Sequence, residues 1–459
     1  MAHEITTDIC IIGAGSGGLS LAAGAVQMGA RVVLVEGHKM GGDCLNYGCV
    51  PSKALLAAGR MLPPLSHRDA LDHVRETIAT IEPHDSQERF EGLGVRVIRD
   101  WGRFTSRETL EAGGYVIRAR RFVIATGSGP LVPPIDGLSD VPFLTNETIF
   151  DLTEQPEHLI IIGGGPIGLE MAQAHRQLGC KVTVIEGAKA LGRDDPEMAA
   201  VVVQRLSAQG IDIRENTSAQ KVTQGDDGRI SVETSSGSVS GSHLLVAVGR
   251  QVNLDRLELD RAGVEHSAKG VTVRADLRSF SNRRVYAIGD AAGGLHFTHV
   301  AGYHAGVVIR SILFGLRAKA RADHIPWVTY TEPELAHVGL SEAEARQRYG
   351  DAIEVIRQPY SGMDRAIATG MTEGLAKVIV YKGRPVGAAI AGAHAGDLIG
   401  VWALAIANGL KMSAVANTVL PYPSLGEINK RLAGSYFSPR LFESAMVKRV
   451  VRTVQRVLP

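Results

Sequence analysis

Cys44 and Cys49 lie in the run GGDCLNYGCVPSK, which spans Gly41 to Lys53. A thiolate is the nucleophile of disulfide exchange, and a helix N-terminus or a nearby cation increases the ionised fraction of a thiol. A proline and several helix formers follow Cys49, so we expect both cysteines close to the positive end of a helix. The pair therefore predicts a redox-active disulfide.

Two other interpretations of this pair stay open, a metal site and two passively packed thiols. A structural zinc site needs four ligands, and the sequence near the pair offers no second C-x-x-C or histidine pair. We therefore predict no resident metal. The remaining cysteines, Cys10 and Cys180, lie in apolar runs and are predicted to be small core residues.

The composition limits the classes of protein that the chain can represent. Its 459 residues are enough for about two to four domains. With 49 basic and 48 acidic residues the chain is nearly neutral, which argues against a nucleic-acid partner. The start lacks the features of a secretory signal, and no run reaches the ~18 apolar residues of a membrane span. We predict a cytoplasmic protein that acts on small molecules.

An internal repeat at an offset of 150 residues organises the first half of the chain. The run DICIIGAGSGGLSLAAGAVQMGARVVLVEG recurs as HLIIIGGGPIGLEMAQAHRQLGCKVTVIEG. Each copy has an apolar run, a G-x-G-x-x-G motif, a helical stretch and a second apolar run that ends in glutamate. That order is typical of a dinucleotide-binding unit. The motif residues are Gly13, Gly15, Gly18 and Glu36 in the first copy, and Gly163, Gly165, Gly168 and Glu186 in the second.

Glycines at this spacing permit a tight turn and a close approach of the backbone to a pyrophosphate, and the carboxylate accepts hydrogen bonds from ribose hydroxyls. Two copies predict two different cofactors, since a flavin commonly mediates between a hydride donor and a substrate. A third signal, RRVYAIGDAAG, predicts a buried strand that ends near Asp290. This carboxylate could bind the ribityl chain of a flavin.

These motifs resemble those of the class I pyridine nucleotide-disulfide oxidoreductases, the family of dihydrolipoamide dehydrogenase, glutathione reductase and mercuric reductase. The resemblance covers essentially the full length and rests on GAGSGG at 13–18, the cysteine segment, ATGS at 125–128, GGGPIGLE at 163–170, AVGR at 247–250 and the AIGD turn. It implies that the first fingerprint binds FAD and the second binds NAD(H). The implied FAD site is Gly13, Gly15, Gly18, Glu36, Lys53, Thr126, Gly127, Gly289 and Asp290, and the implied NAD site is Gly163, Gly165, Gly168, Glu186 and Gly249.

The resemblance also implies roles for the catalytic residues. Cys44 would exchange with the substrate, while Cys49 would lie against the flavin and form a charge-transfer pair with it. Lys53 and Glu170 would pair near the flavin, where a cation stabilises the reduced ring and the thiolate. Electrons would pass from the nicotinamide to the flavin, then to the disulfide and to the acceptor.

Glu186 bears on the choice of nicotinamide cofactor. A glutamate at the end of the second strand hydrogen-bonds the adenosine ribose diol and repels a 2′-phosphate, so we predict NADH over NADPH. Arg193, seven residues later, is the reservation, because a flexible arginine could still reach a phosphate.

The C-terminal region departs from the family pattern. The family's disulfide reductases usually carry a His-Pro…Glu motif, whose histidine is the acid-base catalyst at the other subunit's disulfide. Here the segment reads PYPSLGEINKR, with Tyr422 at the histidine position and Glu427 retained. A phenol titrates near about 10 and an imidazole near about 6.5, so tyrosine is a poor base at neutral pH. His299, His304 and His394 are other candidate proton carriers, although packing roles are more typical of such histidines.

This tyrosine and the run HDSQERFEGLGVRVI are reminiscent of mercuric reductases. That activity normally relies on a vicinal cysteine pair near the C-terminus, and no cysteine follows Cys180 here. The favoured function is therefore electron transfer with a small-molecule or protein-bound disulfide/dithiol substrate, as in dihydrolipoamide dehydrogenase. A metal-ion, quinone or diaphorase-type reductase is the alternative, and a binding subunit with structural cofactors is the least favoured reading.

The predicted fold is α/β, with two Rossmann-like dinucleotide-binding domains, for FAD and NAD, and a C-terminal α+β dimerisation domain. Because the family builds its active site from both subunits, we expect a C2 homodimer. The predicted boundaries are 1–150 for the FAD domain, 151–275 for the NAD(P) domain, 276–322 for a central segment that returns to the FAD domain, and 323–459 for the interface domain.

The final segment, RLFESAMVKRVVRTVQRVLP, has apolar residues on one helical face and basic residues on the other. This pattern predicts a helix packed at an interface, with its basic face in solvent. Contact with an anionic membrane surface is the less favoured alternative.

Overall fold

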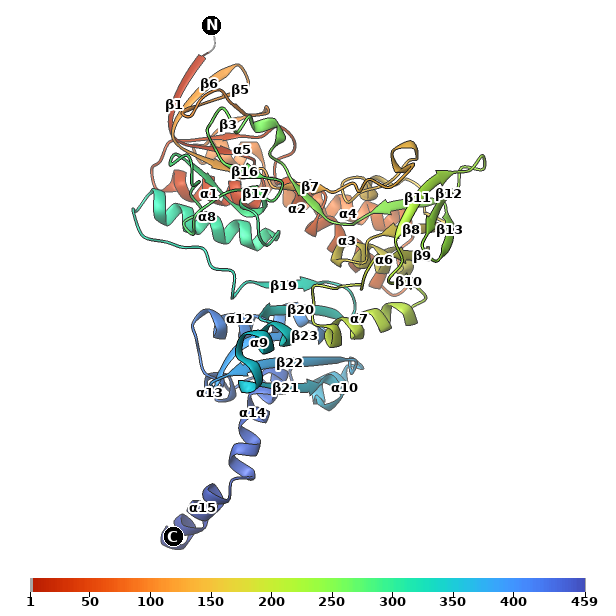
Figure 1. Ribbon diagram of the computed structural model, residues 1–459, viewed down its shortest axis with the longest axis vertical. Helices are drawn as coiled ribbons and strands as arrows, with labels where there is room; N and C mark the ends of the chain where they lie inside the picture. The colour runs from red at the N-terminus through yellow and green to blue at the C-terminus, as the bar shows by residue number, and fades with distance from the viewer. Residues whose placement is uncertain (1–2, 459) are drawn as a thin grey trace. The chain divides into compact units, whose positions relative to one another are not determined.

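The computed structural model describes residues 3–458, which form two compact units (Figure 1). The first unit combines the chain up to residue 187 with residues 211–322, and the second combines residues 188–210 with the chain from residue 323. Among the described residues, no helix is both long enough and apolar enough to cross a membrane.

The first sheet of unit 1 has the strand order β3-β2-β1-β6-β5-β4, with β18 also paired to β6. Strands β1, β2, β3, β6 and β18 are parallel, and β5 and β4 are antiparallel additions. All four residues of β2 are buried, as expected for a parallel strand with both faces covered. The strands are β1 (His3–Ile12), β2 (Val32–Val35), β3 (Arg96–Ile98), β4 (Arg103–Phe104), β5 (Thr109–Ala112), β6 (Tyr115–Ile124) and β18 (Val285–Ala287).

The side chains of β1 alternate between two hydrophobic cores. Ile9 and Ile11 pack with residues of the helices α1 and α8, which lie side by side in Figure 1, whereas Cys10 and Ile12 contribute to the core on the other face. Cys10 is fully buried, as its apolar surroundings predict. The helices of this part are α1 (Ser16–Gln27), α2 (Gly42–Asn46), α3 (Cys49–Arg60), α4 (His67–Ile81), α5 (Gln87–Gly92) and α8 (Thr298–Ile312).

The second copy of the repeat forms a parallel sheet of its own, in the order β10-β9-β8-β14. Helix α6 (Pro166–Gln177) connects β8 to β9, just as α1 connects β1 to β2. A three-stranded antiparallel sheet shares a hydrophobic core with this parallel sheet. The strands are β8 (His158–Ile162), β9 (Lys181–Ile185), β10 (Asp212–Arg214), β11 (Ala219–Gln224), β12 (Ile230–Thr234), β13 (Gly237–Gly241) and β14 (His243–Val246).

Two short strand pairs complete unit 1. They are antiparallel, and the first joins the residues that follow β6 to those that follow β14. Their members are β7 (Ser128–Pro130) with β15 (Arg250–Val252), and β16 (His266–Ser267) with β17 (Gly270–Val271).

Unit 2 contains one antiparallel sheet in the order β19-β20-β23-β22-β21. A mixed sheet built around parallel strands, a parallel sheet and this antiparallel one confirm the predicted α/β class with a C-terminal α+β part. The strands are β19 (Pro326–Thr329), β20 (Glu334–Gly339), β21 (Ile353–Pro359), β22 (Gly374–Tyr381) and β23 (Arg384–Gly392). The helices are α7 (Pro196–Ala208), α9 (Glu342–Tyr349), α10 (Asp364–Ala368), α11 (Ala395–Leu398), α12 (Gly400–Ala407), α13 (Met412–Ala416), α14 (Glu427–Phe442) and α15 (Ala445–Val457).

Candidate active site

The two cysteines lie on consecutive helices that follow β2. Cys44 is in the short helix α2, and Cys49 is the first residue of α3, which is 12 residues long. Both are free thiols, and they are hydrogen-bonded to each other. Cys49 Sγ also lies 3.4 Å from Oγ1 of Thr298, at the start of α8. The structure thus brings the two predicted residues together at a helix N-terminus.

Their surroundings give the two thiols different acidities. The hydrogen bond from Cys44 is the main cause that lowers the pKa of Cys49 to about 6, and the Thr298 hydroxyl and the Lys53 ammonium act in the same direction. The same hydrogen bond, together with burial, raises the pKa of Cys44 far above its ordinary value. At neutral pH Cys49 is therefore a thiolate and Cys44 is the thiol that donates to it.

Lys53 and Glu170 form an ion pair between α3 and α6. Lys53 Nζ donates to Glu170 Oε2 at 2.7 Å. Glu170 is only 4% exposed, whereas Lys53 is partly exposed and also donates to the hydroxyl of Ser52 at 3.2 Å. The helix that begins with the Cys49 thiolate therefore carries a fixed cation one turn later.

Replacing this cation tests its effect on the thiolate. In Lys53→Met we expect the pKa of Cys49 to rise, because the Lys53 charge lowers it. Disulfide turnover should fall by about ten- to a hundredfold. The pKa is read from the pH dependence of site-resolved alkylation by iodoacetamide. Arg60→Met, which removes a cation from the last turn of the same helix, should leave the pKa of Cys49 and disulfide turnover unchanged. Equal effects of the two substitutions would refute the role of Lys53.

The protein's own structure does not require glycine at the second glycine position of either fingerprint. Gly15 and Gly165 both have φ −77° and ψ −178°, which any residue adopts. A Cβ on Gly165 would meet no atom within 4 Å, and one on Gly15 would meet only the Cα of Gly42, at 3.9 Å. By contrast, a Cβ on Gly13 or Gly163 would lie 2.3 or 2.4 Å from a backbone oxygen. Open space at the start of α1 and α6 is what an approaching pyrophosphate requires.

The glutamates that follow β2 and β9 have matching surroundings. Glu36 accepts hydrogen bonds from the backbone N–H groups of Ala14 at 2.6 Å and His38 at 2.7 Å. Glu186 accepts one from the N–H of Gly164 at 2.7 Å. Each carboxylate is thus held beside its glycine turn, where it could accept from the ribose of a dinucleotide.

Asp290 lies in the 3-10 turn that follows β18 and belongs to a polar network. It accepts a hydrogen bond from the Ser128 hydroxyl at 2.5 Å, and Arg250 Nε lies 4.0 Å from it. Arg250 is also paired with Asp43, the neighbour of Cys44, at 3.0 Å. Nearby in the sequence, the buried hydroxyl of Thr126 has no hydrogen-bond partner within residues 3–458. A carboxylate and an orphaned hydroxyl after the first sheet fit a polar chain such as that of FAD.

Sequence reasoning missed several contributors to this site. Ser128 and Arg250 stand in the ATGS and AVGR motifs, yet nothing in either motif shows that their side chains bond, at 2.7 Å. Thr298 follows Cys49 by 249 residues, and no local signal connects them. The sequence signal that could have identified Ser128 and Arg250 was their place in these motifs, and no such signal existed for Thr298.

Tyr422 and Glu427 lie in unit 2. The Tyr422 hydroxyl donates to Asp364 Oδ2 at 2.9 Å, and this bond raises the pKa of the phenol above its ordinary value. Glu427 Oε2 is buried and, in the part of the chain that the structure describes, has no hydrogen-bond partner. The phenol is thus oriented by Asp364, and at neutral pH even less of it is ionised, and so able to act as a base, than in an ordinary tyrosine.

The three histidines considered as proton carriers have other surroundings. His304 Nδ1 accepts a hydrogen bond from the N–H of Gly289 at 3.2 Å, and burial lowers its pKa. His299 stacks on Phe297 with ring centroids 5.4 Å apart. His394 lies 3.7 Å from Asp397 in unit 2. His304 therefore supports the turn that carries Asp290.

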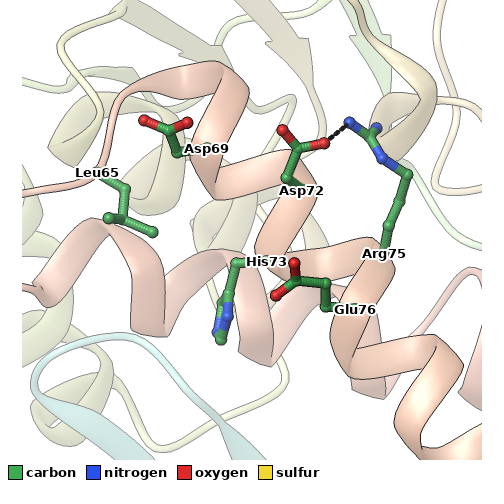
Figure 2. Close-up of a pocket in the computed structure, with 6 residues that line it drawn as sticks. All are labelled: Leu65, Asp69, Asp72, His73, Arg75 and Glu76. Carbon is green, nitrogen blue, oxygen red and sulfur yellow. Dashed lines mark hydrogen bonds and ion pairs between the residues drawn. The ribbon is translucent and has the colours of Figure 1, made fainter.

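A cavity of about 480 Å³ lies along α4, and none of the predicted site residues lines it (Figure 2). Its charged groups are partly neutralised, since Asp72 is paired with Arg75. We assign no chemistry to this acidic surface. The lining residues are Leu65, Asp69, Asp72, His73, Arg75 and Glu76.

The chain belongs to the pyridine nucleotide-disulphide oxidoreductase family. The model of the family matches residues 7–305, and the model of the family's dimerisation domain matches residues 325–433. Enzymes of this family use FAD and a pyridine nucleotide, and the dimerisation domain implies a homodimer. The family and the class of enzyme inferred from the motifs are confirmed.

Relatives within the family differ in activity. A mercuric reductase of Lysinibacillus sphaericus is 31% identical over 93% of this chain and 82% of its own length. A dihydrolipoyl dehydrogenase of Bacillus subtilis is 33% identical over 94% of this chain and 96% of its own. The solved Cu(II) complex of the HOCl-induced flavoprotein disulfide reductase RclA from Escherichia coli has a TM-score of 0.87 at 27% identity, covering 94% of this chain and 99% of that one. Because relatives with two different activities are almost equally similar to this chain, the similarity identifies the family but not the substrate.

Proposed function

We propose that this protein is an NADH-preferring flavoenzyme of the cytoplasm that passes electrons between the nicotinamide cofactor and a disulfide or dithiol substrate through Cys44 and Cys49. The observation that carries the proposal is the placement of Cys44 in α2 and of Cys49 at the first residue of α3, 3.4 Å from the Thr298 hydroxyl. In this arrangement the pKa of Cys49 is lowered and that of Cys44 is raised. FAD, when bound, supplies the exchange of electrons between the nicotinamide and the cysteine pair.

The proposal assigns each cofactor to one fingerprint. Residues 1–150 with 276–322 would form the FAD domain, 151–275 the NAD domain and 323–459 the interface domain. The FAD ligands would be Gly13, Gly15, Gly18, Glu36, Lys53, Thr126, Gly127, Gly289 and Asp290, and the NAD ligands would be Gly163, Gly165, Gly168, Glu186 and Gly249.

The thiol chemistry follows from the two acidities. Cys44, once deprotonated, attacks one sulfur of the substrate disulfide and forms a mixed disulfide, while the first substrate thiolate leaves and takes up a proton. The Cys49 thiolate then attacks Cys44 Sγ, which forms the Cys44–Cys49 disulfide and releases the second substrate thiolate. The substrate gains two electrons, and the nicotinamide cofactor supplies two electrons that restore the thiols. Lys53 stabilises the Cys49 thiolate in this cycle.

A steady-state panel tests the acceptor. The purified holoenzyme is assayed with lipoamide or dihydrolipoamide, glutathione disulfide, mercuric ion and quinones, as wild type and as Tyr422→His. Because imidazole can deprotonate Cys44 at neutral pH, we expect the histidine to raise disulfide turnover by about ten- to a hundredfold and to leave quinone turnover unchanged. Faster turnover of quinone or metal ion than of any disulfide in both proteins would overturn the proposal.

A second candidate is a metal-ion or quinone reductase, and Tyr422 is the observation that favours it. Tyrosine replaces the histidine that serves as base in the family's disulfide reductases, and the raised pKa of its phenol keeps it protonated at neutral pH. Several curated relatives are mercuric reductases. Against this candidate, no cysteine follows Cys180 to deliver a metal ion.

Cofactor preference gives a further prediction. The Glu186 carboxylate would face the 2′-phosphate of NADPH, and such like-charge contacts cost several kcal/mol. We therefore expect kcat/KM for NADH to exceed that for NADPH by about a hundredfold, and Glu186→Gln to reduce this ratio by about tenfold. Arg193→Met is the matched variant, which tests whether that arginine aids NADPH. Equal use of both cofactors by the wild type would contradict the assignment.

A further inference from the structure

The last helix, α15, presents two chemically distinct faces. Ser444 caps its start by accepting a hydrogen bond from the N–H of Val447 at 3.3 Å. Every residue of the helix except Val447 is exposed. One face is apolar and the opposite face is basic, with no acidic residue from 444 to 458. The apolar face consists of Met446, Val447, Val450, Val451, Val454, Val457 and Leu458, and the basic face carries Lys448, Arg449, Arg452 and Arg456.

The apolar face is unusually exposed for such side chains. Met446 and Val457 are each 75% exposed, and Phe442, at the end of α14, is 71% exposed. In Figure 1, α15 is joined to the five-stranded sheet of unit 2 only through α14. Contiguous exposed apolar residues of this kind mark a surface that binds another protein, a membrane or a ligand.

A second copy of the helix fits this surface poorly. Thirteen residues are fewer than two heptads, whereas coiled coils need at least three to four. The apolar arc also includes Met446, Val450 and Val457, so it is wider than the two-position seam of a coiled coil. The family's dimerisation model ends at residue 433, before α15 begins.

We propose that α15 binds the surface of a bilayer that contains anionic phospholipid. The apolar face would enter the boundary between headgroups and acyl chains, and the four cations would meet the phosphates. A homodimer presents two such helices, so the second would bind with the advantage of a high local concentration. This proposal goes beyond the proposed function, since it depends on neither the cofactors nor the cysteines.

Vesicle binding by the full-length holoenzyme tests the proposal. The probes are vesicles of phosphatidylcholine with phosphatidylglycerol and vesicles of phosphatidylcholine alone. The wild type should sediment with the anionic vesicles, bind the neutral ones at least about tenfold more weakly, and lose affinity as salt increases. Val454→Asp should reduce binding to anionic vesicles by at least about tenfold, because it puts a charge on the apolar face.

The adjacent substitution Thr453→Asp is the matched control. It adds the same charge on the polar side of the helix, and we expect binding to fall by no more than about threefold. Flavin content and NADH oxidation should be unchanged in both variants. Absence of binding by the wild type, or equal losses in the two variants, would overturn the proposal. So would conversion to a monomer on deletion of residues 444–459, measured by light scattering, because α15 would then be a subunit contact.

Discussion

Serine in place of Cys49 should lower disulfide turnover by at least about a thousandfold, because a hydroxyl cannot form the disulfide that ends each cycle. Cys44→Ser should be equally inactive with disulfides. The two variants should differ in spectrum before any NADH is added: with oxidised flavin bound, Cys44→Ser should already show the long-wavelength absorption of a thiolate against flavin, and Cys49→Ser should lack it. A band that persists in Cys49→Ser would reverse the assigned roles.

The acidity of Cys49 can be measured without turnover. In the reduced wild type, its site-resolved alkylation rate should rise with pH through a midpoint near 6, since the folded pKa is about 6 and only the thiolate reacts. The thiolate is present above this pH and is lost as the pH falls below it. Cys44→Ala removes the hydrogen-bond donor that is the main cause of the low pKa, so the midpoint should move upward. A midpoint that stays in place would show that Lys53 and the helix end dominate instead.

Cys180→Ala is the matched control for the loss of a thiol. Cys180 is 1% exposed in unit 1, and burial raises its pKa to about 11, so it is not ionised at neutral pH. Its loss should change neither the spectrum nor disulfide turnover by more than about twofold, although removal of a buried sulfur should cost about 1 kcal/mol of stability. A large loss of turnover in this variant would indicate damage to the fold.

Because its pKa is raised, Cys44 stays protonated at neutral pH. A thiol that donates to a neighbouring thiolate needs a base before it can attack a disulfide. Tyr422 is not that base, because its own pKa is raised by its bond to Asp364. Turnover of disulfides should therefore increase with pH above neutrality, and the effect of Tyr422→His should be largest near pH 7.

Local patterns explain why so much of unit 1 could be predicted. The glycine fingerprints, the glutamates after β2 and β9, and the helix that begins at Cys49 are each encoded by residues within one strand–turn–helix segment. Their physical requirements, such as the backbone oxygen 2.3 Å from a Cβ on Gly13, act over short stretches of chain. The pairing of Lys53 with Glu170 was anticipated only through the family resemblance, since 117 residues separate them.

Contacts between distant segments could not be predicted in this way. Residues 188–210 group with the C-terminal unit, and nothing in the sequence of this segment indicates that contact. Tyr422 bonds to Asp364, and neither residue type nor spacing singles out that aspartate. One of the contacts between residues 188–210 and the rest of unit 2 is made by Lys377, which the sequence shows only as one polar residue in the apolar run GLAKVIVY.

Methionine in place of Lys377 should lower the free energy of unfolding of unit 2 by about 3–5 kcal/mol, because it leaves the buried carboxylate of Asp195 without its cation. Lys377 is 2% exposed. Its ammonium lies 2.8 Å from Asp195, 2.6 Å from Glu197 and 3.2 Å from Glu342. Burial alone would lower the pKa of Lys377, but the hydrogen bonds to Asp195 and Glu197 outweigh it and leave the pKa raised. Urea unfolding followed by circular dichroism measures the change.

Two further variants separate lost charge pairing from general damage. Arg205→Met breaks the exposed pair with Glu373, at 3.3 Å, and should cost less than about 1 kcal/mol. Combining Lys377→Met with Asp195→Asn should recover part of the loss, because asparagine removes one uncompensated charge and can still cap α7. A double variant less stable than Lys377→Met alone would contradict the electrostatic explanation.

The pH dependence of the free energy of unfolding is a third measure of the charged groups around Lys377. Hydrogen bonds from Arg357, and secondly from Lys377, lower the pKa of Glu197 to about 2. A carboxylate whose folded pKa is lowered stabilises the protein above its unfolded pKa, and this contribution is lost as the pH falls towards about 2. In Lys377→Met the pKa of Glu197 should be lowered less, so unfolding free energy should fall less steeply between about pH 5 and pH 3. Because Arg357 remains, the dependence should weaken without vanishing, and Arg357→Met should weaken it more.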